Sequence, residues 1–158
     1  DKSLLDEMLS AANLAPSWKN SQTPRFYVAT GEKSKNAVRE ALPEFNRKNS
    51  ENASAYIVTT VVLNRSGFDK DGTAVTEIGN GWAYYDLGLN NMALLLKATE
   101  LGISTLVMGI RDGEKLRKEF DIPETEAVVS VIAVGYTDSE IVRPKRKSLE
   151  DFAKFYEE

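Results

Sequence analysis

Apolar residues recur at helical spacing near the start of the sequence, which predicts an amphipathic helix. The apolar face consists of Leu4, Leu5, Met8, Leu9 and Ala12. Ser3, followed by Asp6, predicts an N-cap and a weak capping box at the helix start. Pro16 is expected to end the helix, because the residue before a proline disfavours helical backbone.

Runs of β-branched and other apolar residues predict the strands of a sheet. The strong runs cover residues 26–30, 55–63 and 128–136, and a shorter strand is expected at residues 104–108. The run at residues 55–63 is nearly free of charge, which is typical of a central strand. Further helices are expected at residues 33–42, at residues 113–120 and from Ser148 onward.

The longest predicted helix covers residues 82–101 and is apolar around much of its circumference. Its apolar residues include Leu87, Met92, Ala93, Leu95, Leu96 and Leu101. A helix of this kind is buried, either in the core or against another subunit. Gly102 follows it and is expected to supply the left-handed residue that closes the helix.

The order of these elements indicates an α+β fold in a single domain that spans residues 1–158. Strands and helices mix without the strict rhythm of a parallel α/β protein, and neither an internal repeat nor a linker divides the chain. We therefore expect a central mixed or antiparallel sheet flanked by helices.

The composition argues against nucleic acid and membranes as partners. The formal net charge is −4, so no global positive field attracts nucleic acid or an anionic lipid surface. No apolar run approaches the roughly 20 residues that span a bilayer, and no signal peptide is visible. We expect a cytoplasmic protein. Because the sequence does not begin with methionine, residues ahead of Asp1 are expected to be missing from this numbering.

The chain contains no Cys and no His, which removes many catalytic mechanisms. Disulfides, thiolate nucleophiles, catalytic imidazoles and the usual zinc sites all need one of these residues. An enzyme of this composition would use carboxylates, Lys or Tyr, or a bound cofactor that brings its own reactive atoms. The cofactor alternative fits best.

Residues 64–81 form a polar, glycine-bearing insertion for which a turn is expected. Its DKDG stretch resembles part of a calcium loop, but the remaining ligand positions do not follow, so no metal site is expected. Gly79 and Gly81 provide two glycines of a dinucleotide-binding fingerprint without the third. Binding of dinucleotides or nucleoside triphosphates through the standard phosphate loops is therefore not expected.

Four other segments carry groups suited to binding. Pro16 and Pro24 bracket a loop that is rich in donors and acceptors and holds Trp18. The RPKRK run at residues 143–147 is either a solvated tail or an anion site, since Arg offers a bidentate fork to phosphate. Gly109 either begins a turn or lets a flat ligand approach the backbone. The fourth segment, FNRKN at residues 45–49, is by itself typical of a loop.

Together these segments resemble the FMN-dependent nitroreductase family, in the same order along nearly the whole chain. The match rests on AANLAPSWKNSQTPRF, FNRKN, LLLKATELGIST, LVMGIRD with IPETEAVVSVIAVGY, and RPKRKSLEDF. The family has Trp after the loop proline, where this chain has Arg25. The family also begins with an Arg-rich segment that grips the FMN phosphate. Either that segment is absent from this numbering, or the protein lacks it and phosphate binding falls mainly on Arg146 and its neighbours.

The resemblance implies an FMN site shared across a homodimer interface. Residues of the first loop would line the flavin, either the one bound by the same chain or the one bound by its partner. Asn46 would contact the flavin or its ribityl chain. Lys48 or Asn49 would approach N1 and O2, and the segment from Leu106 to Gly109 would pass along the ring with the Gly109 N–H near N5. The implied cofactor-binding residues are Pro16, Ser17, Trp18, Asn20, Asn46, Lys48, Leu106, Met108 and Gly109, with Lys145 and Arg146 on the phosphate.

The implied activity is hydride transfer from NAD(P)H through flavin N5 to nitroaromatics, quinones or similar small-molecule acceptors, with no catalytic protein residue. The main alternative is a non-enzymatic homodimer that stores FMN or senses redox state. A third alternative is a homo-oligomeric interaction domain in which the long apolar helix forms the interface and the basic tail is solvated. The sequence does not identify the electron acceptor, and it does not show whether NADH or NADPH is the preferred electron donor.

Overall fold

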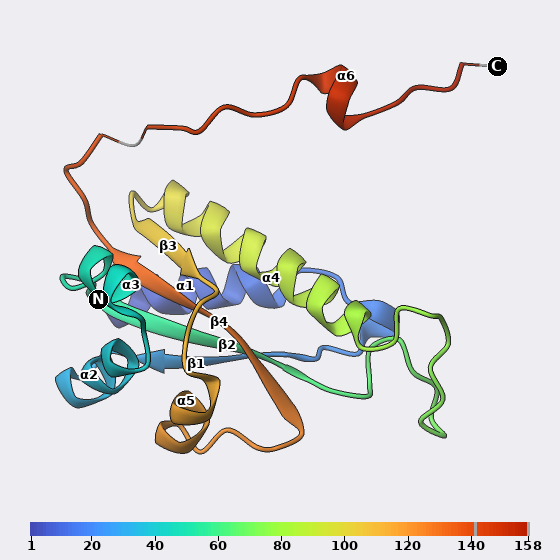
Figure 1. Ribbon diagram of the computed structural model, residues 1–158, viewed down its shortest axis with the longest axis horizontal. Coiled ribbons are helices and arrows are strands. Elements are labelled where there is room, and N and C mark those ends of the chain that lie inside the picture. The colour runs from blue at the N-terminus through green and yellow to red at the C-terminus, as the bar shows by residue number, and fades with distance from the viewer. Residues whose placement is uncertain (141, 158) are drawn as a thin grey trace.

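Four strands form one antiparallel sheet in the order β1-β2-β4-β3 (Figure 1). The computed structural model describes residues 1–140 and 142–157. The strands are β1 (Pro24–Ala29), β2 (Ala55–Val62), β3 (Ser104–Met108) and β4 (Glu126–Gly135). Each neighbouring pair runs antiparallel, which confirms the predicted α+β class with its central sheet.

Helices cover both faces of this sheet (Figure 1). On one face α1 (Lys2–Asn13) packs against α4 (Gly81–Glu100), and on the other α2 (Glu32–Glu40) packs against α5 (Gly113–Glu119). The shorter elements are η1 (Trp18–Asn20), a 3-10 turn before β1, together with α3 (Glu44–Asn49) and α6 (Leu149–Phe152). None of the helices in the described ranges is long and apolar enough to cross a membrane.

The two helical layers are held by alternate residues of the central strands. Ile57 pairs with Ile132 and both point toward α1 and α4, whereas Val58 pairs with Val131 and both point toward α2 and α5. All four side chains are fully buried. Because successive side chains of a strand point to opposite faces, the uncharged run predicted as a central strand builds both cores at once.

The first helix begins two residues earlier than its predicted cap. The N-cap is Asp1, whose side chain accepts the Ser3 N–H at 3.0 Å, so the predicted cap at Ser3 is wrong. Asp6 does not complete a capping box, because its carboxylate instead pairs with Lys2 at 2.7 Å. A carboxylate two residues ahead of Ser3 competes successfully for the free N–H groups of the helix start.

The segment FNRKN is helical rather than a loop, so that prediction is also wrong. It forms α3, with Glu44 in its first turn and Arg47 and Lys48 in its last. This order of charges favours a helix because acidic residues stabilise the N-terminus and basic residues the C-terminus. A polar turn this short carries no apolar periodicity, and for that reason hydrophobic spacing does not reveal it.

The long helix α4 is buried on one side only. Ala83, Leu87, Leu94 and Ala98 are buried, in line with the predicted core position. The opposite side exposes Tyr85, Met92 and Leu96, each by more than half of its surface. Gly102 has a φ of 71° just after the helix, as predicted for its closing residue. The exposed apolar side is available for the contact with another subunit that the sequence led us to expect.

After β4 the chain leaves the domain as an extended arm, which we define as residues 137–140 and 142–157 (Figure 1). The hydrogen bonds found in the described part of this arm stay within it. The helix predicted from Ser148 onward is present as α6, and Ser148 caps it, because the Ser148 hydroxyl accepts the Asp151 N–H. The arm exposes several apolar side chains, namely Val142, Leu149, Phe152, Phe155 and Tyr156.

A buried carboxylate ties three strands together at one end of the sheet. Glu126 of β4 is only 6% exposed, and its Oε2 accepts the hydroxyls of Tyr27 at 3.0 Å and Thr60 at 2.5 Å. Its backbone carbonyl accepts a bond from Arg117 at 2.9 Å. Burial, followed by the hydrogen bond to Glu126, raises the pKa of Tyr27 to about 12.

Tyr27→Phe is expected to reduce the loss of stability at alkaline pH. The folded chain holds the Tyr27 proton more tightly than the unfolded chain, so this stabilisation is complete below pH 10.0 and is lost toward pH 12. Denaturant titrations at about pH 9 and about pH 11 should show a steeper fall in unfolding free energy for the wild type than for Tyr27→Phe. Equal falls would contradict this assignment.

Candidate functional site

Asn46 joins α3 to the end of β3. Its Nδ2 donates to the Ile110 carbonyl at 3.1 Å, although the two residues are 64 positions apart. Asn46 therefore lies near Gly109, the residue next to Ile110. A Cβ at Gly109 would meet no atom within 4 Å, so the backbone there is open to a flat molecule. We call Asn46, Lys48, Leu106 and Gly109 the α3–β3 site.

A cavity of about 430 Å³ lies beside the α3–β3 site. Lys48 and Leu106 line it, together with residues 49–53, 104–105 and 133–137. The Lys48 side chain is exposed and Leu106 is 40% exposed. The cavity thus combines one cation, Lys48, and one carboxylate, Glu51, with apolar surface and strand backbone, a mixture suited to a largely flat ligand with polar edges.

Met108 differs from its neighbours in the predicted site. Its side chain is only 2% exposed and packs in the core beside α2 and α5. Only the backbone of Met108 can reach a ligand at the α3–β3 site.

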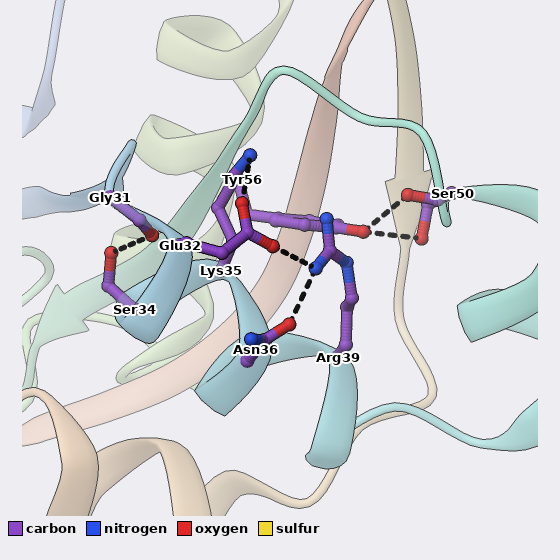
Figure 2. Close-up of polar contacts among 8 residues, drawn as sticks. All are labelled: Gly31, Glu32, Ser34, Lys35, Asn36, Arg39, Ser50 and Tyr56. Carbon is purple, nitrogen blue, oxygen red and sulfur yellow. Dashed lines mark hydrogen bonds and ion pairs between the residues drawn. The ribbon is translucent and has the colours of Figure 1, made fainter.

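Tyr56 of β2 holds the C-terminal end of α3 (Figure 2). Its hydroxyl donates to the carbonyl of Ser50, the residue that closes α3, and lies 3.2 Å from Ser50 Oγ. The Tyr56 side chain is fully buried. The position of α3, and with it of Asn46 and Lys48, is therefore set by the central strand of the sheet.

Arg39 covers the Tyr56 ring from the side of α2 (Figure 2). Its guanidinium lies 5.8 Å from the ring centre, and Nη1 donates to Glu32 at 2.9 Å and to Asn36 at 2.6 Å. The hydrogen bond with Glu32 raises the pKa of Arg39, and the same bond, followed by one from Lys35, lowers the pKa of Glu32. Both groups therefore stay charged, and the cation stays over the ring.

The loop between α1 and β1 has an unusual backbone. Lys19, Asn20 and Gln22 have φ values of 45°, 56° and 50°, a region that residues other than glycine rarely adopt. The Trp18 N–H donates to both carboxylate oxygens of Asp86 on α4, each at 3.1 Å. Strained backbone persists only where the surrounding structure imposes it. The first loop is thus held in place by the fold.

Trp18 of this loop packs against Trp82, with ring centres 4.7 Å apart and the ring planes tilted by 47°. The Trp18 indole Nε1 is buried and finds no acceptor among the described residues. A separate polar cavity of about 440 Å³ is lined by Ser17 and Asn20, whereas Pro16 is exposed at the surface. An unpaired buried donor next to polar loop residues suits a ligand with acceptor atoms.

The first loop and the α3–β3 site lie at opposite edges of the sheet. The loop leads into β1, and the other site lies along β3, with β2 and β4 between them. Three inter-strand steps of about 4.8 Å put the two edge strands roughly 14 Å apart. A single chain therefore does not bring these two groups of predicted cofactor-binding residues together.

The two basic residues predicted for the phosphate lie on the arm. Lys145 and Arg146 are both exposed, and Arg146 Nη1 donates to the nearby Pro144 carbonyl at 3.0 Å. The arm leads away from the sheet, so within one chain these cations stay apart from the first loop and the α3–β3 site (Figure 1).

Residues 1–136 match a family model described as the nitroreductase family. This chain belongs to the nitroreductase family. The matched region contains every strand and every helix from α1 to α5, and it ends where the arm begins. The resemblance read from the sequence motifs is thereby confirmed.

Solved structures of nitroreductases and related enzymes share the fold. A nitroreductase family protein from Streptococcus pneumoniae TIGR4 gives a TM-score of 0.82 at 20% identity, covering 99% of this chain and 90% of that chain. A gut-bacterial enone reductase of fatty acid saturation metabolism gives 0.84 at 21%, covering 98% and 87%. An oxidoreductase containing FMN gives 0.82 at 26%, covering 98% and 81%. Among curated proteins nothing matches significantly.

Sequence reasoning missed three residues that organise this nitroreductase chain. Asp86 could have been found, because it is an acidic residue inside a helix that is otherwise largely apolar. Tyr56 and Ile110 gave no such signal. Tyr56 sits within an apolar strand, and Ile110 acts only through its backbone carbonyl.

Tyr56→Phe is expected to destabilise this nitroreductase chain by about 1 kcal/mol, because it removes a buried hydrogen bond to the Ser50 carbonyl, which then keeps only the Ala53 N–H at 3.0 Å. Urea denaturation measures the loss. Tyr84→Phe is the matched control, since Tyr84 is exposed and is expected to change stability little. An unchanged midpoint for Tyr56→Phe would show that the hydroxyl does not hold α3.

Proposed function

We propose that this chain is one half of a homodimeric, FMN-dependent oxidoreductase. When bound, FMN supplies the two-electron chemistry that takes hydride from NAD(P)H and reduces nitroaromatics, quinones or similar small acceptors. The protein supplies binding, orientation and electrostatics. That division of labour suits a chain without Cys or His.

The hydrogen bond from Asn46 to the Ile110 carbonyl carries this proposal. It joins two segments that are distant in the sequence and that family resemblance assigns to the same cofactor. Beside this bond the open backbone at Gly109 offers an N–H without a side chain in the way. The exposed Lys48 adds a cation within the same α3 turn. A reduced flavin is an anion, and donors and a cation of this kind stabilise it.

The remaining residues fit the other parts of FMN. The Trp18 indole N–H, which has no acceptor within residues 1–140 and 142–157, and the amide of Asn20 offer donors to the polar edge of the ring. Arg146 and Lys145 offer charge-assisted bonds to the phosphate. Leu106 supplies apolar surface for a ring face. No residue of the chain needs to act as a nucleophile or as a proton donor through imidazole or thiol.

A second copy of the chain explains how these groups meet. Within one protomer the first loop and the α3–β3 site lie at opposite sheet edges. In a homodimer with twofold symmetry the loop of one protomer faces the α3–β3 site of its partner, so that two equivalent sites form. We therefore assign the loop and the α3–β3 site of each flavin to different protomers.

Exposed apolar surface supports the same assembly. Tyr85, Met92 and Leu96 form an unburied face on α4, and the arm carries further exposed residues, among them Phe152 and Phe155. An apolar face of this kind is typical of a subunit interface. Burial of the arm on the partner would also bring Lys145 and Arg146 to a defined place.

The activity test uses the purified full-length protein and its visible spectrum. The protein is expected to carry a flavin spectrum that bleaches when NADH or NADPH is added without oxygen and returns when a quinone or nitroaromatic is added. A flavin spectrum that ignores both nicotinamides would contradict the reductase activity and support FMN storage or redox sensing. A colourless protein that takes up no added FMN would contradict the cofactor itself.

The shared site predicts complementation between two defective variants. Asn20→Gly removes a loop side chain while glycine keeps the positive φ of 56°, and Asn46→Ala removes the bond to Ile110. Each homodimer should bind FMN poorly. A heterodimer of the two, co-expressed with different tags, should keep about one of its two sites intact, because one loop and one α3–β3 site remain unaltered.

Flavin content per heterodimer is the measurement, with the two variant homodimers and the wild type as controls. A heterodimer as poor in FMN as the homodimers would contradict the assignment, since that result means that loop and α3–β3 site come from the same protomer.

A further inference from the structure

The carboxylate of Asp86 is buried at the junction of three segments. Asp86 lies on α4 and is 2% exposed. Both of its oxygens accept the Trp18 N–H at 3.1 Å, and Oδ2 also accepts the Ser66 hydroxyl at 2.5 Å. The helix α4, the first loop and the insertion after β2 thus meet at the Asp86 carboxylate. Its hydrogen-bond donors, the Trp18 N–H and the Ser66 hydroxyl, are both uncharged.

The first loop needs an anchor of this kind. Its own hydrogen bonds run from Asn20 N to the Ser17 carbonyl at 3.0 Å, from Ser21 N to the Trp18 carbonyl at 2.8 Å and from Gln22 N to Ser17 Oγ at 3.0 Å. These bonds close the turn on itself. At its far end Arg25 of β1 donates to the Gln22 carbonyl at 2.7 Å, and the exposed Lys19 lies 3.4 Å from Asp69 of the insertion. Three left-handed residues in so short a turn are costly, and only external contacts keep such backbone ordered.

Asp86 also acts as the missing cap of the 3-10 turn. Ser17 occupies the N-cap position of η1, but its side chain makes no capping bond. Trp18 is the first residue of the turn, and its N–H has no partner within the turn. The carboxylate from α4 accepts that N–H, so a residue distant in the sequence does what a cap residue does locally.

The insertion supports the anchor from its other side. Ser66 is fully buried, and a Cβ on the neighbouring Gly67 would lie 2.6 Å from the Gly79 carbonyl and 2.7 Å from the Trp82 ring. The Trp82 indole in turn donates to Thr76 at 2.8 Å. Because this packing leaves no room to shift, the Ser66 hydroxyl is held where it meets the Asp86 carboxylate.

We infer that Asp86 is a positioning residue for the cofactor, which acts by holding the first loop in the strained conformation that presents Trp18 and Asn20 to the flavin. This inference rests on the proposed FMN site. It adds a role for a residue that does not itself touch the ligand and that lies outside the motifs by which the family was recognised.

The test compares four full-length proteins: wild type, Asp86→Ala, Asp86→Asn and Glu126→Ala. Asn keeps an oxygen for the Trp18 N–H and an amide for Ser66, so it is the conservative rescue. Glu126 is the matched control, because it is likewise a buried carboxylate that accepts two hydroxyl bonds but makes none to the first loop. Two quantities are measured: the FMN dissociation constant, and the near-UV circular dichroism of the packed Trp18–Trp82 pair without added FMN.

Asp86→Ala should raise the FMN dissociation constant about tenfold or more, because a buried N–H and a strained turn lose their external partner. The dichroism of the tryptophan pair should weaken in the same variant. Asp86→Asn should stay within about threefold of the wild type, since it restores the acceptor. Glu126→Ala should lose thermal stability yet keep both the dissociation constant and the dichroism.

An Asp86→Ala protein with wild-type FMN affinity and dichroism would overturn the inference, and so would a Glu126→Ala protein that loses FMN affinity equally. If the wild type binds no FMN, the proposed function fails, whereas the dichroism still decides whether Asp86 holds the loop. If Asp86→Ala does not fold, Ser66→Ala takes its place, with an expected rise of about threefold in the dissociation constant. No rise would overturn the inference.

Discussion

The pairing of β2 with β4 is the constraint on which the rest of the structure depends. These two strands alternate residues such as Ile57 and Val58 between the two helical layers, so neither core forms without them. With β2 and β4 inside, β1 and β3 become the edges. That order separates the first loop from the α3–β3 site, and the separation is the physical reason for assigning each flavin to two chains.

Each half of the candidate site is held by a buried polar side chain from an inner element. Tyr56 reaches from β2 to close α3, and Asp86 reaches from α4 to cap η1. Both bonds end on backbone groups, so they define position without adding a reactive group. This arrangement suits a protein whose chemistry comes from a bound cofactor, because orientation is then what the chain must supply. It also places the strained, positive-φ backbone of Lys19 and Asn20 next to a residue, Trp18, that is hydrogen-bonded to α4.

Much of the fold could be predicted from the sequence, since it follows from strong periodicity. β3 was predicted to the residue, and the uncharged run that became β2 was correctly placed at the sheet centre. α3 was missed because so short a helix is set by charge order and by the Tyr56 bond rather than by an apolar face. For the site, the resemblance grouped Asn46 with Gly109, and their proximity follows from a bond to the Ile110 carbonyl that no side-chain pattern encodes. The separation of the loop from these residues depends on strand order, which spacing along the chain does not reveal.

The central claim is that one flavin site is built from two chains. Sedimentation velocity of the purified protein, followed simultaneously by protein absorbance and by flavin absorbance, tests it most directly. The account predicts that flavin absorbance sediments only with a particle of two chains, at about one FMN per chain. Flavin that sediments with single chains, or a two-chain particle that carries no flavin after FMN is supplied, would contradict it.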